Sequence, residues 1–377
     1  MNKKPYPKTI FGFLRSKIIV NILIVICSVV FTIGTIEIIT GGLISHKVTQ
    51  FHKKIVSYHT LLTKSPWPIG AYRYHKTIGY ELTPSFSGMV KKNRYFLKTH
   101  NLGYRIPKFE DSDSYEPGGI LSYGCSFTFG SGVEAEETFS YLAAKHFNLP
   151  SYNYGVCSYS YASVILQLEE LDKKGILKKL KPSIVILGAG NWLIRRSLSP
   201  FYPTKIFQFA YAYIGKQGNR LQIKQPDSFY STKHLYSLVG GYFDGNNRKD
   251  KLTFGRYLKL LYIAPRVTKA RLDKKFFKRP KISSRQLYDF VIGRILKILR
   301  KYDTRFVILW MPIVADQIDV NLAKSVKGFE NILLVDGLKA IEKNNVDPKY
   351  YYKRHPRVEA HDAYAKALII AMKESLK

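Results

Sequence analysis

Apolar and polar positions along the carboxyl-terminal two thirds of the chain follow a regular alternation. From Gly119 onward, short apolar runs alternate with amphipathic segments. Continuous apolar runs are typical of strands buried on both faces, and apolar positions three or four residues apart are typical of helices. The pattern predicts strands at 120–124, 151–156, 183–189, 305–311 and 331–336, and helices at 136–147, 161–180, 285–302 and 360–376. This order predicts a three-layer α/β/α sandwich around a five-stranded parallel sheet.

The amino-terminal part has a different pattern, because Ile18 to Ile36 form an apolar run without a charge. About 19 residues at 1.5 Å per residue roughly span the hydrocarbon core of a bilayer. We therefore expect one transmembrane helix within an anchor at 18–44, preceded by a basic cytoplasmic segment at 1–17. A cleaved signal peptide and a buried helix are the alternatives. The run is longer than a signal peptide's apolar part, and no small-residue cleavage site follows it.

Two segments interrupt this organisation. Residues 45–118 lack strong periodicity and contain short extended pieces and turns, so we interpret them as an extracytoplasmic approach segment that packs against the main domain at 119–377. An insertion of roughly ninety residues, at about 192–284, is far longer than an ordinary connection. Its most basic part, 269–279, mixes Lys and Arg with Phe. This composition suits an anionic polysaccharide, lipid headgroups or nucleic acid, and a solvated helix face is the alternative.

Charge and cysteine content narrow the classes of protein. The formal net charge of +33 favours anionic partners. The three cysteines, Cys27, Cys125 and Cys157, exclude a disulfide-rich scaffold and have no metal-ligand spacing, so we expect neither a metal nor a cofactor. A disulfide between Cys125 and Cys157 stays open, because both follow neighbouring predicted strands. His100 and His361 are interpreted as structural.

Polar residues that could take part in catalysis follow the predicted strands. Residues 124–130 contain glycine at both ends and predict a tight turn that presents Ser126 after the first strand. Gly155 follows the second strand, Asn191 follows the third, and His355 precedes the last helix. Because the carboxyl ends of parallel strands meet at one edge of a sheet, we expect these residues to lie together.

These four blocks, in this order, resemble the SGNH hydrolase family, which is also called the GDSL-type esterases and acyltransferases and includes membrane-anchored bacterial members. The resemblance covers about 119–376. It implies an SGNH-like domain in which Ser126 is the nucleophile and His355 is the base. It also implies an oxyanion hole formed by the N–H groups of Ser126 and Gly155 and the side-chain amide of Asn191.

The sequence departs from the family's pattern in three blocks. In one of them Trp192 follows Asn191, where the family normally continues with Asp. Cys125 stands where the family usually has Asp, and it is the less favoured nucleophile because Ser126 occupies the turn position. The family's triad Asp lies two or three residues before the histidine, where this chain has Tyr352 and Lys353. Lys353 is expected to lower the basicity of His355. Asp347, Glu359 or Asp362 could orient the imidazole from elsewhere in the chain. Otherwise a backbone carbonyl orients it, which leaves a Ser–His dyad.

Two hypotheses of different classes follow. The first is a single-pass serine esterase or O-acyltransferase on the periplasmic side of a bacterial inner membrane. It acts on acyl groups, in particular O-acetyl groups, of an envelope glycan or a small ester. The sequence does not separate hydrolysis from transfer, because both share an acyl-enzyme. The second is a catalytically degenerate SGNH-fold protein that binds or helps assemble an anionic envelope polysaccharide. Nucleic-acid binding follows from charge alone and is excluded for a domain that faces outward.

Overall fold

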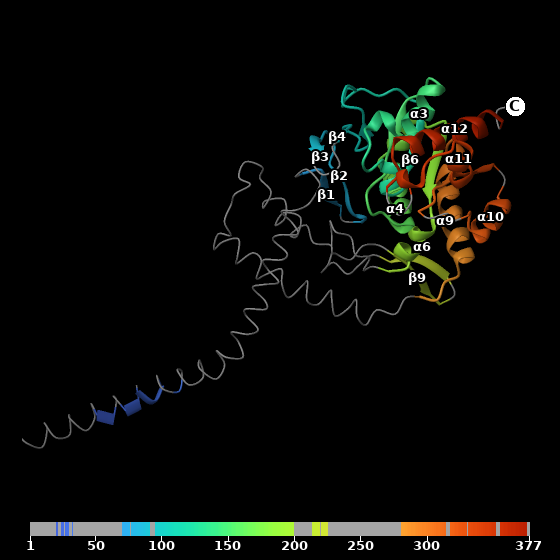
Figure 1. Cartoon of the computed structure of the whole chain (residues 1–377). Helices are drawn as coiled ribbons and strands as arrows, with labels where there is room; N and C mark the ends of the chain where they lie inside the picture. The colour runs from blue at the N-terminus through green and yellow to red at the C-terminus, as the bar shows by residue number, and fades with distance from the viewer. Residues whose placement is uncertain are drawn as a thin grey trace, which may run out of the picture. The chain divides into compact units, whose positions relative to one another are not determined.

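A computed structural model of the chain describes two compact units, Met1–Thr63 and Lys64–Lys377 (Figure 1). Of the first unit it describes only helical residues at positions 20, 21, 24, 25, 27–29 and 32. Of the second it describes 70–75, 77–90, 95–199, 213–218, 220–224, 280–313, 317–329, 331–351 and 355–374. The fold and the candidate site both lie in this second unit.

The second unit is organised around a sheet with the strand order β12-β11-β8-β6-β7-β5-β4-β3. The strands from β12 to β7 pair in parallel, and this part confirms the five predicted strands. Their bounds are β6 (Ile120–Tyr123), β7 (Ser151–Asn153), β8 (Ile184–Ala189), β11 (Arg305–Trp310) and β12 (Ile332–Asp336). The prediction of a purely parallel five-stranded sheet is nevertheless wrong, because the sheet is mixed and has eight strands.

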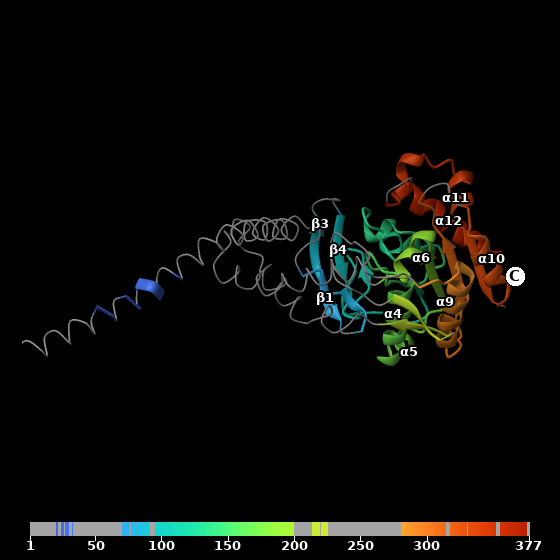
Figure 2. The same cartoon turned by 90° about the horizontal axis from the view of Figure 1, so that it is seen from below.

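The three additional strands come from the segment interpreted as an approach to the domain. They are β3 (Ser87–Val90), β4 (Tyr95–Thr99) and β5 (Arg105–Ile106), and all pair antiparallel. Their physical role is to cover the backbone edge of β7, which would otherwise expose unpaired N–H and C=O groups. Figure 2 shows β3 and β4 at the end of the sheet away from α10 (Val320–Lys327).

Helices cover both faces of the parallel strands. One layer contains α3 (Phe139–His146) and α12 (Val358–Glu374), which pack together, with α11 (Gly337–Lys343) against α12. The other layer contains α4 (Tyr161–Lys173) and α9 (Ser284–Leu299), with α10 against α9. The predicted three-layer arrangement is therefore present. Strands β6, β8 and β11 form its core, and Ile186 and Ile308 are fully buried.

Two of the predicted helices have different bounds in the structure. The helix predicted at 136–147 begins at Phe139, because the Thr138 side chain accepts a hydrogen bond from the Tyr141 N–H and caps it. A 3-10 turn, η1 (Ala135–Glu137), precedes it. The segment predicted as one helix at 161–180 forms α4 and a short α5 (Ile176–Leu180), which are separated at Gly175, whose φ is 69°. Glycine reaches this left-handed conformation without steric cost.

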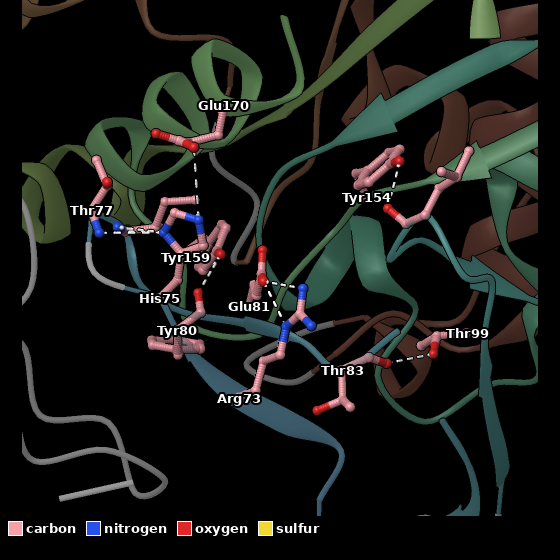
Figure 3. Close-up of polar contacts among 12 residues, drawn as sticks. Arg73, His75, Thr77, Tyr80, Glu81, Thr83, Thr99, Tyr154, Tyr159 and Glu170 are labelled. Carbon is pink, nitrogen blue, oxygen red and sulfur yellow. Dashed lines mark hydrogen bonds and ion pairs between the residues drawn. The ribbon is translucent and has the colours of Figure 1, made fainter. Parts of the chain in front are cut away.

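The hairpin of β1 (Tyr72–His75) and β2 (Gly79–Leu82) is fastened to the loop after β7 (Figure 3). The Tyr80 hydroxyl donates to the Cys157 carbonyl at 2.6 Å. The Tyr159 hydroxyl donates to the Tyr80 carbonyl at 2.6 Å. His75 of β1 lies 3.9 Å from the Glu170 carboxylate on α4. The segment at 70–106 is therefore part of the folded unit that carries the candidate site.

Several predictions fall on parts of the chain that the structure does not describe. Most of the expected anchor at 18–44 and the basic stretch 269–279 lie outside the described residues. Within the residues that are described, no helix has both the length and the apolar character needed to cross a bilayer. The described part of the expected insertion contains α6 (Asn191–Ser197) and a hairpin of β9 (Tyr213–Gln217) and β10 (Arg220–Lys224).

The two histidines interpreted as structural are both fully buried. His100 Nε2 lies 2.9 Å from the Ser114 carbonyl, and its Nδ1 accepts from the Leu102 N–H. His361 on α12 accepts a hydrogen bond from the Phe139 N–H at its Nδ1, so it joins α12 to the first turn of α3. Burial lowers the pKa of His361 to about 3, and the charge of Arg105 adds to this shift.

The lowered pKa of His361 predicts that acid destabilises the second unit. Below pH 6.5 the unfolded chain binds a proton that the folded imidazole excludes, so stability falls as the pH falls. One such group contributes a slope of about 1.4 kcal/mol per pH unit until the folded pKa is reached. In urea unfolding at pH 7, 6 and 5, His361→Asn should lower the slope by about this amount, since an amide does not titrate. The exposed His146→Asn is the control, and equal slopes in wild type and His361→Asn would contradict the assignment.

Candidate active site

Ser126 lies at the turn between β6 and a one-turn helix, α2 (Ser126–Phe129). Gly124 has φ of 157°, and a Cβ there would lie 2.3 Å from Thr128 Oγ1. Gly130 ends α2 with φ of 78° and bonds its N–H back to the helix. Both glycines occupy positions that a side chain would strain, and together they allow β6 to turn sharply into α2. The predicted tight turn is present, with Ser126 at the carboxyl end of β6.

The structure brings Ser126 and His355 together, although 229 positions separate them in the sequence. His355 Nε2 lies 3.0 Å from Ser126 Oγ, which is hydrogen-bonding distance. Phe127 packs beside this pair, with its ring centroid 5.5 Å from that of His355 and 4.6 Å from that of Trp192. Ser126 itself is 4% exposed. The Ser126 hydroxyl and the His355 imidazole therefore lie within hydrogen-bonding distance at the carboxyl edge of the sheet, beside the aromatic ring of Phe127.

The environment of His355 favours the neutral imidazole. Desolvation of the ring, and then the positive charges of Arg196 and Arg357, lower the pKa of His355 to about 4, although the residue as a whole is exposed. A neutral imidazole has a lone pair that can accept the hydroxyl proton of Ser126. The same charges oppose formation of the imidazolium. The sequence assigned this effect to Lys353, which lies outside the described residues.

The carboxylates considered as partners of His355 are engaged elsewhere or have no contact with it. Asp347 accepts from the Lys349 N–H and pairs with Lys349 Nζ at 2.8 Å. Asp362 pairs with Lys366 Nζ at 2.7 Å. Across the described ranges, no residue accepts a hydrogen bond from His355 Nδ1. Among the described residues, the His355 ring is therefore hydrogen-bonded to Ser126 and to no carboxylate.

Gly155 does not present its N–H as the resemblance implied. That N–H donates to Asn153 Oδ1 at 2.9 Å. A Cβ on Gly155 would lie 2.3 Å from the Phe129 nitrogen, so the glycine is needed for the close approach of α2. The structure therefore gives Gly155 a packing role, and the oxyanion role that the resemblance implied stays a prediction. Of the remaining predicted donors, Ser126 begins α2 at the end of β6, and Asn191 begins α6 at the end of the adjacent strand β8.

Asn153 is a site residue that the sequence argument missed. Its side-chain Nδ2 donates to the Thr128 carbonyl at 2.9 Å, while its Oδ1 accepts from Gly155. It therefore joins the loop after β7 to the helix that carries Ser126. Its place directly after a predicted strand, in the same block as Gly155, was the available signal.

The two cysteines near the turn are free thiols in the structure. Cys125 and Cys157 are 0% and 3% exposed. Burial raises the pKa of Cys157 to about 12, so its thiolate is not formed at neutral pH. In the parts of the chain that are described, no group of three or more His, Cys, Asp or Glu residues is arranged to hold a metal ion.

A cavity of about 460 Å³ lies away from this edge and includes neither Ser126 nor His355. Its wall contains Tyr104, Tyr141, Pro150 and Ser151, and the last of these begins β7. The cavity is therefore at the amino end of a parallel strand, whereas the dyad is at the carboxyl end of one.

Comparisons with known proteins find solved structures with a similar course of the chain, and two of them are described here. One is a G-D-S-L family lipolytic protein from Desulfitobacterium hafniense DCB-2, with 12% identity and a TM-score of 0.31, covering 67% of this chain and 98% of that one. The other is a carbohydrate esterase family 2 enzyme with a carbohydrate-binding domain from Corynascus thermopiles (Myceliophthora fergusii), with 12% identity and a TM-score of 0.39, covering 73% and 70%. No family model and no curated protein matches the chain. At these identities and TM-scores the similarities assign no activity to this chain. Any assignment of activity therefore rests on the residues of the site.

The packing of Gly155 gives a direct test of the geometry around α2. Gly155→Ala should destabilise the second unit by roughly 1–3 kcal/mol in urea unfolding, because the new methyl group meets the backbone of Phe129. Gly293→Ala is the matched control, because Gly293 lies within α9 and a Cβ there meets nothing within 4 Å. That change should stabilise by roughly 0.5–1 kcal/mol. Equal tolerance of both substitutions would be incompatible with the close approach.

Proposed function

We propose that the chain is an SGNH-type serine esterase or O-acyltransferase in which Ser126 attacks an acyl carbonyl and His355 accepts its proton. The observation that carries the proposal is the 3.0 Å contact between His355 Nε2 and Ser126 Oγ. It is supported by the position of Ser126 at the carboxyl end of a parallel strand, where open α/β folds place their chemistry. The order of the sequence blocks supports the same assignment.

The proposed reaction proceeds in two halves. Ser126 Oγ forms a bond to the acyl carbon as its proton moves to His355 Nε2, and the carbonyl oxygen becomes an oxyanion. Collapse of this intermediate breaks the ester bond, and His355 returns the proton to the leaving alcohol. Water or a sugar hydroxyl then attacks the acyl-serine, with His355 again taking and returning a proton. Water gives an esterase, and a sugar hydroxyl gives an acyltransferase.

The oxyanion requires hydrogen-bond donors close to the carbonyl oxygen of the bound acyl group. We assign this role to the Ser126 N–H and the Asn191 side chain, which come from adjacent strand ends. Each such donor contributes roughly 3–4 kcal/mol to the stability of a transition state. Gly155 is omitted, because its N–H is bonded to Asn153.

The charges around the dyad support a substrate that carries negative charge. Arg196 and Arg357 both act on His355, and they oppose the imidazolium that forms during attack. An anionic group on the substrate would offset these positive charges while it is bound. Together with the net charge of +33, this favours acyl groups, in particular O-acetyl groups, on an anionic envelope polysaccharide. We further propose that residues 18–44 anchor the chain in a bacterial inner membrane and that the second unit faces the periplasm.

The second candidate is an SGNH-fold protein that binds such a polysaccharide without turning it over. Two observations favour it: His355 lacks a carboxylate partner among the described residues, and the Gly155 N–H is already bonded. A neutral acetyl ester separates the two candidates, because only an enzyme releases acetate from it.

Ser126→Ala is the first test of the proposed enzyme. The variant should hydrolyse a small acetyl ester at a kcat roughly 10³-fold or more below wild type, because alanine has no hydroxyl to attack the acyl carbon. Ser114→Ala, on an exposed loop, is the control and should keep wild-type activity. Activity at background level in wild type, or undiminished activity in Ser126→Ala, would refute the esterase.

The lowered pKa of His355 predicts the pH dependence of kcat/KM. The base must be neutral, so activity should fall as the pH drops through about 4. Arg357→Gln removes a positive charge, which raises the pKa of His355 toward 6.5 and moves this acidic limb to higher pH. Arg357→Lys keeps the charge and should leave the limb near that of wild type. A neutral ester is used so that only the protein titrates, and an unmoved limb in Arg357→Gln would contradict the electrostatic assignment.

A further inference from the structure

Arg105 is a buried cation beneath the turn that carries Ser126. It lies on β5, one of the strands that the sequence analysis did not predict, and it is 2% exposed. Its Nη1 donates to the Phe129 carbonyl at 2.6 Å and to the Gly130 carbonyl at 2.9 Å. Its Nη2 donates to the Val133 carbonyl at 2.7 Å. One guanidinium group therefore binds three carbonyl oxygens, two at the end of α2 and one in the loop that follows it.

A charge this deeply buried is costly unless its surroundings satisfy it. The guanidinium carbon lies 4.8 Å from the ring centroid of Tyr95 and 4.7 Å from that of Phe129, so aromatic rings lie close to the cation. The carbonyl oxygens of Phe129 and Gly130 are at the negative end of α2, where a positive charge is stabilised. The site is therefore shaped for a planar cation with several donors.

Arg105 also lies beside Asn153, whose side chain is the second group that binds a carbonyl of α2. In the ladder between β5 and β7, Arg105 is paired with Asn153. Asn153 donates to the Thr128 carbonyl, one residue before the first carbonyl that Arg105 binds. The two neighbours thus fix consecutive carbonyls of the same short helix. Since α2 has four residues and begins at Ser126, a shift of its end moves the serine as well.

We propose that Arg105 is a positioning residue for Ser126: by binding the carbonyls at the end of α2, it holds Ser126 Oγ within reach of His355 Nε2. This inference rests on the proposed function for its catalytic consequence. Lysine does not replace the group, because its single ammonium lacks the planar fork that spans several acceptors. The antiparallel strands β3, β4 and β5 then have a second role, because β5 places Arg105 next to the helix that carries Ser126.

The kinetic test compares Arg105→Lys and Arg105→Met with a control, Arg294→Lys. Arg294 pairs with Glu169 between α9 and α4, away from Ser126. For a neutral acetyl ester, kcat per folded molecule should fall roughly 10- to 100-fold in Arg105→Lys, because a small misplacement of the nucleophile has this effect. KM should change far less, and Arg294→Lys should match wild type. Wild-type kcat per folded molecule in Arg105→Lys would overturn the inference. Arg105→Lys retains the charge, so it keeps the test usable if Arg105→Met does not fold.

Amide hydrogen exchange separates failure of this inference from failure of the proposed function. In Arg105→Lys the amides at 130–133 should exchange at least roughly 10-fold faster than in wild type, while those of β8 keep their protection. If wild type has no esterase activity, the proposed function fails, and faster exchange at 130–133 still supports the positioning of α2 by Arg105. Unchanged exchange there overturns the positioning role, whatever the kinetics show.

Discussion

The site depends on a constraint of distance, because a serine hydroxyl needs an imidazole within hydrogen-bonding reach to lose its proton during attack. The structure meets it with a contact of 3.0 Å between two residues that are 229 positions apart in the sequence. Ser126 is fixed by a sharp turn whose glycines leave no room for side chains. His355 is fixed just before α12, which packs against α3. The packing of the layers therefore brings the start of α2, with Ser126, next to the segment before α12, with His355.

The charges around this contact determine which protonation state of His355 is favoured. Burial and two arginines keep the imidazole neutral, and no described carboxylate stabilises its protonated form. In a triad, the acid orients the imidazole and stabilises the imidazolium. Here the compensating negative charge has to come from the substrate or from outside the described residues. This connects the lack of an acid partner for His355 among the described residues with the proposal of an anionic substrate.

The sequence predicted the parts of this fold that local patterns encode. Buried apolar runs predicted the five parallel strands, and the placement of Ser126 and His355 after and before regular elements predicted that they meet. It missed β5, because two residues carry no periodicity, and with it Arg105, whose partners are backbone carbonyls that leave no signature in the sequence. The sequence placed Gly155 correctly after β7 but did not predict that its N–H is bonded to Asn153, because this contact depends on the local turn geometry. The catalytic roles of Ser126, His355 and Asn191 remain predictions.

The most direct measurement is covalent labelling with a fluorophosphonate, which reacts with a serine hydroxyl that an adjacent base has activated. The intact full-length protein is incubated with the reagent, and peptide mass spectrometry locates the adduct. We predict one adduct on Ser126 in wild type and labelling slowed roughly 100-fold or more in His355→Gln. Labelling at another residue, or an equal rate at Ser126 in both proteins, would contradict a Ser126–His355 dyad.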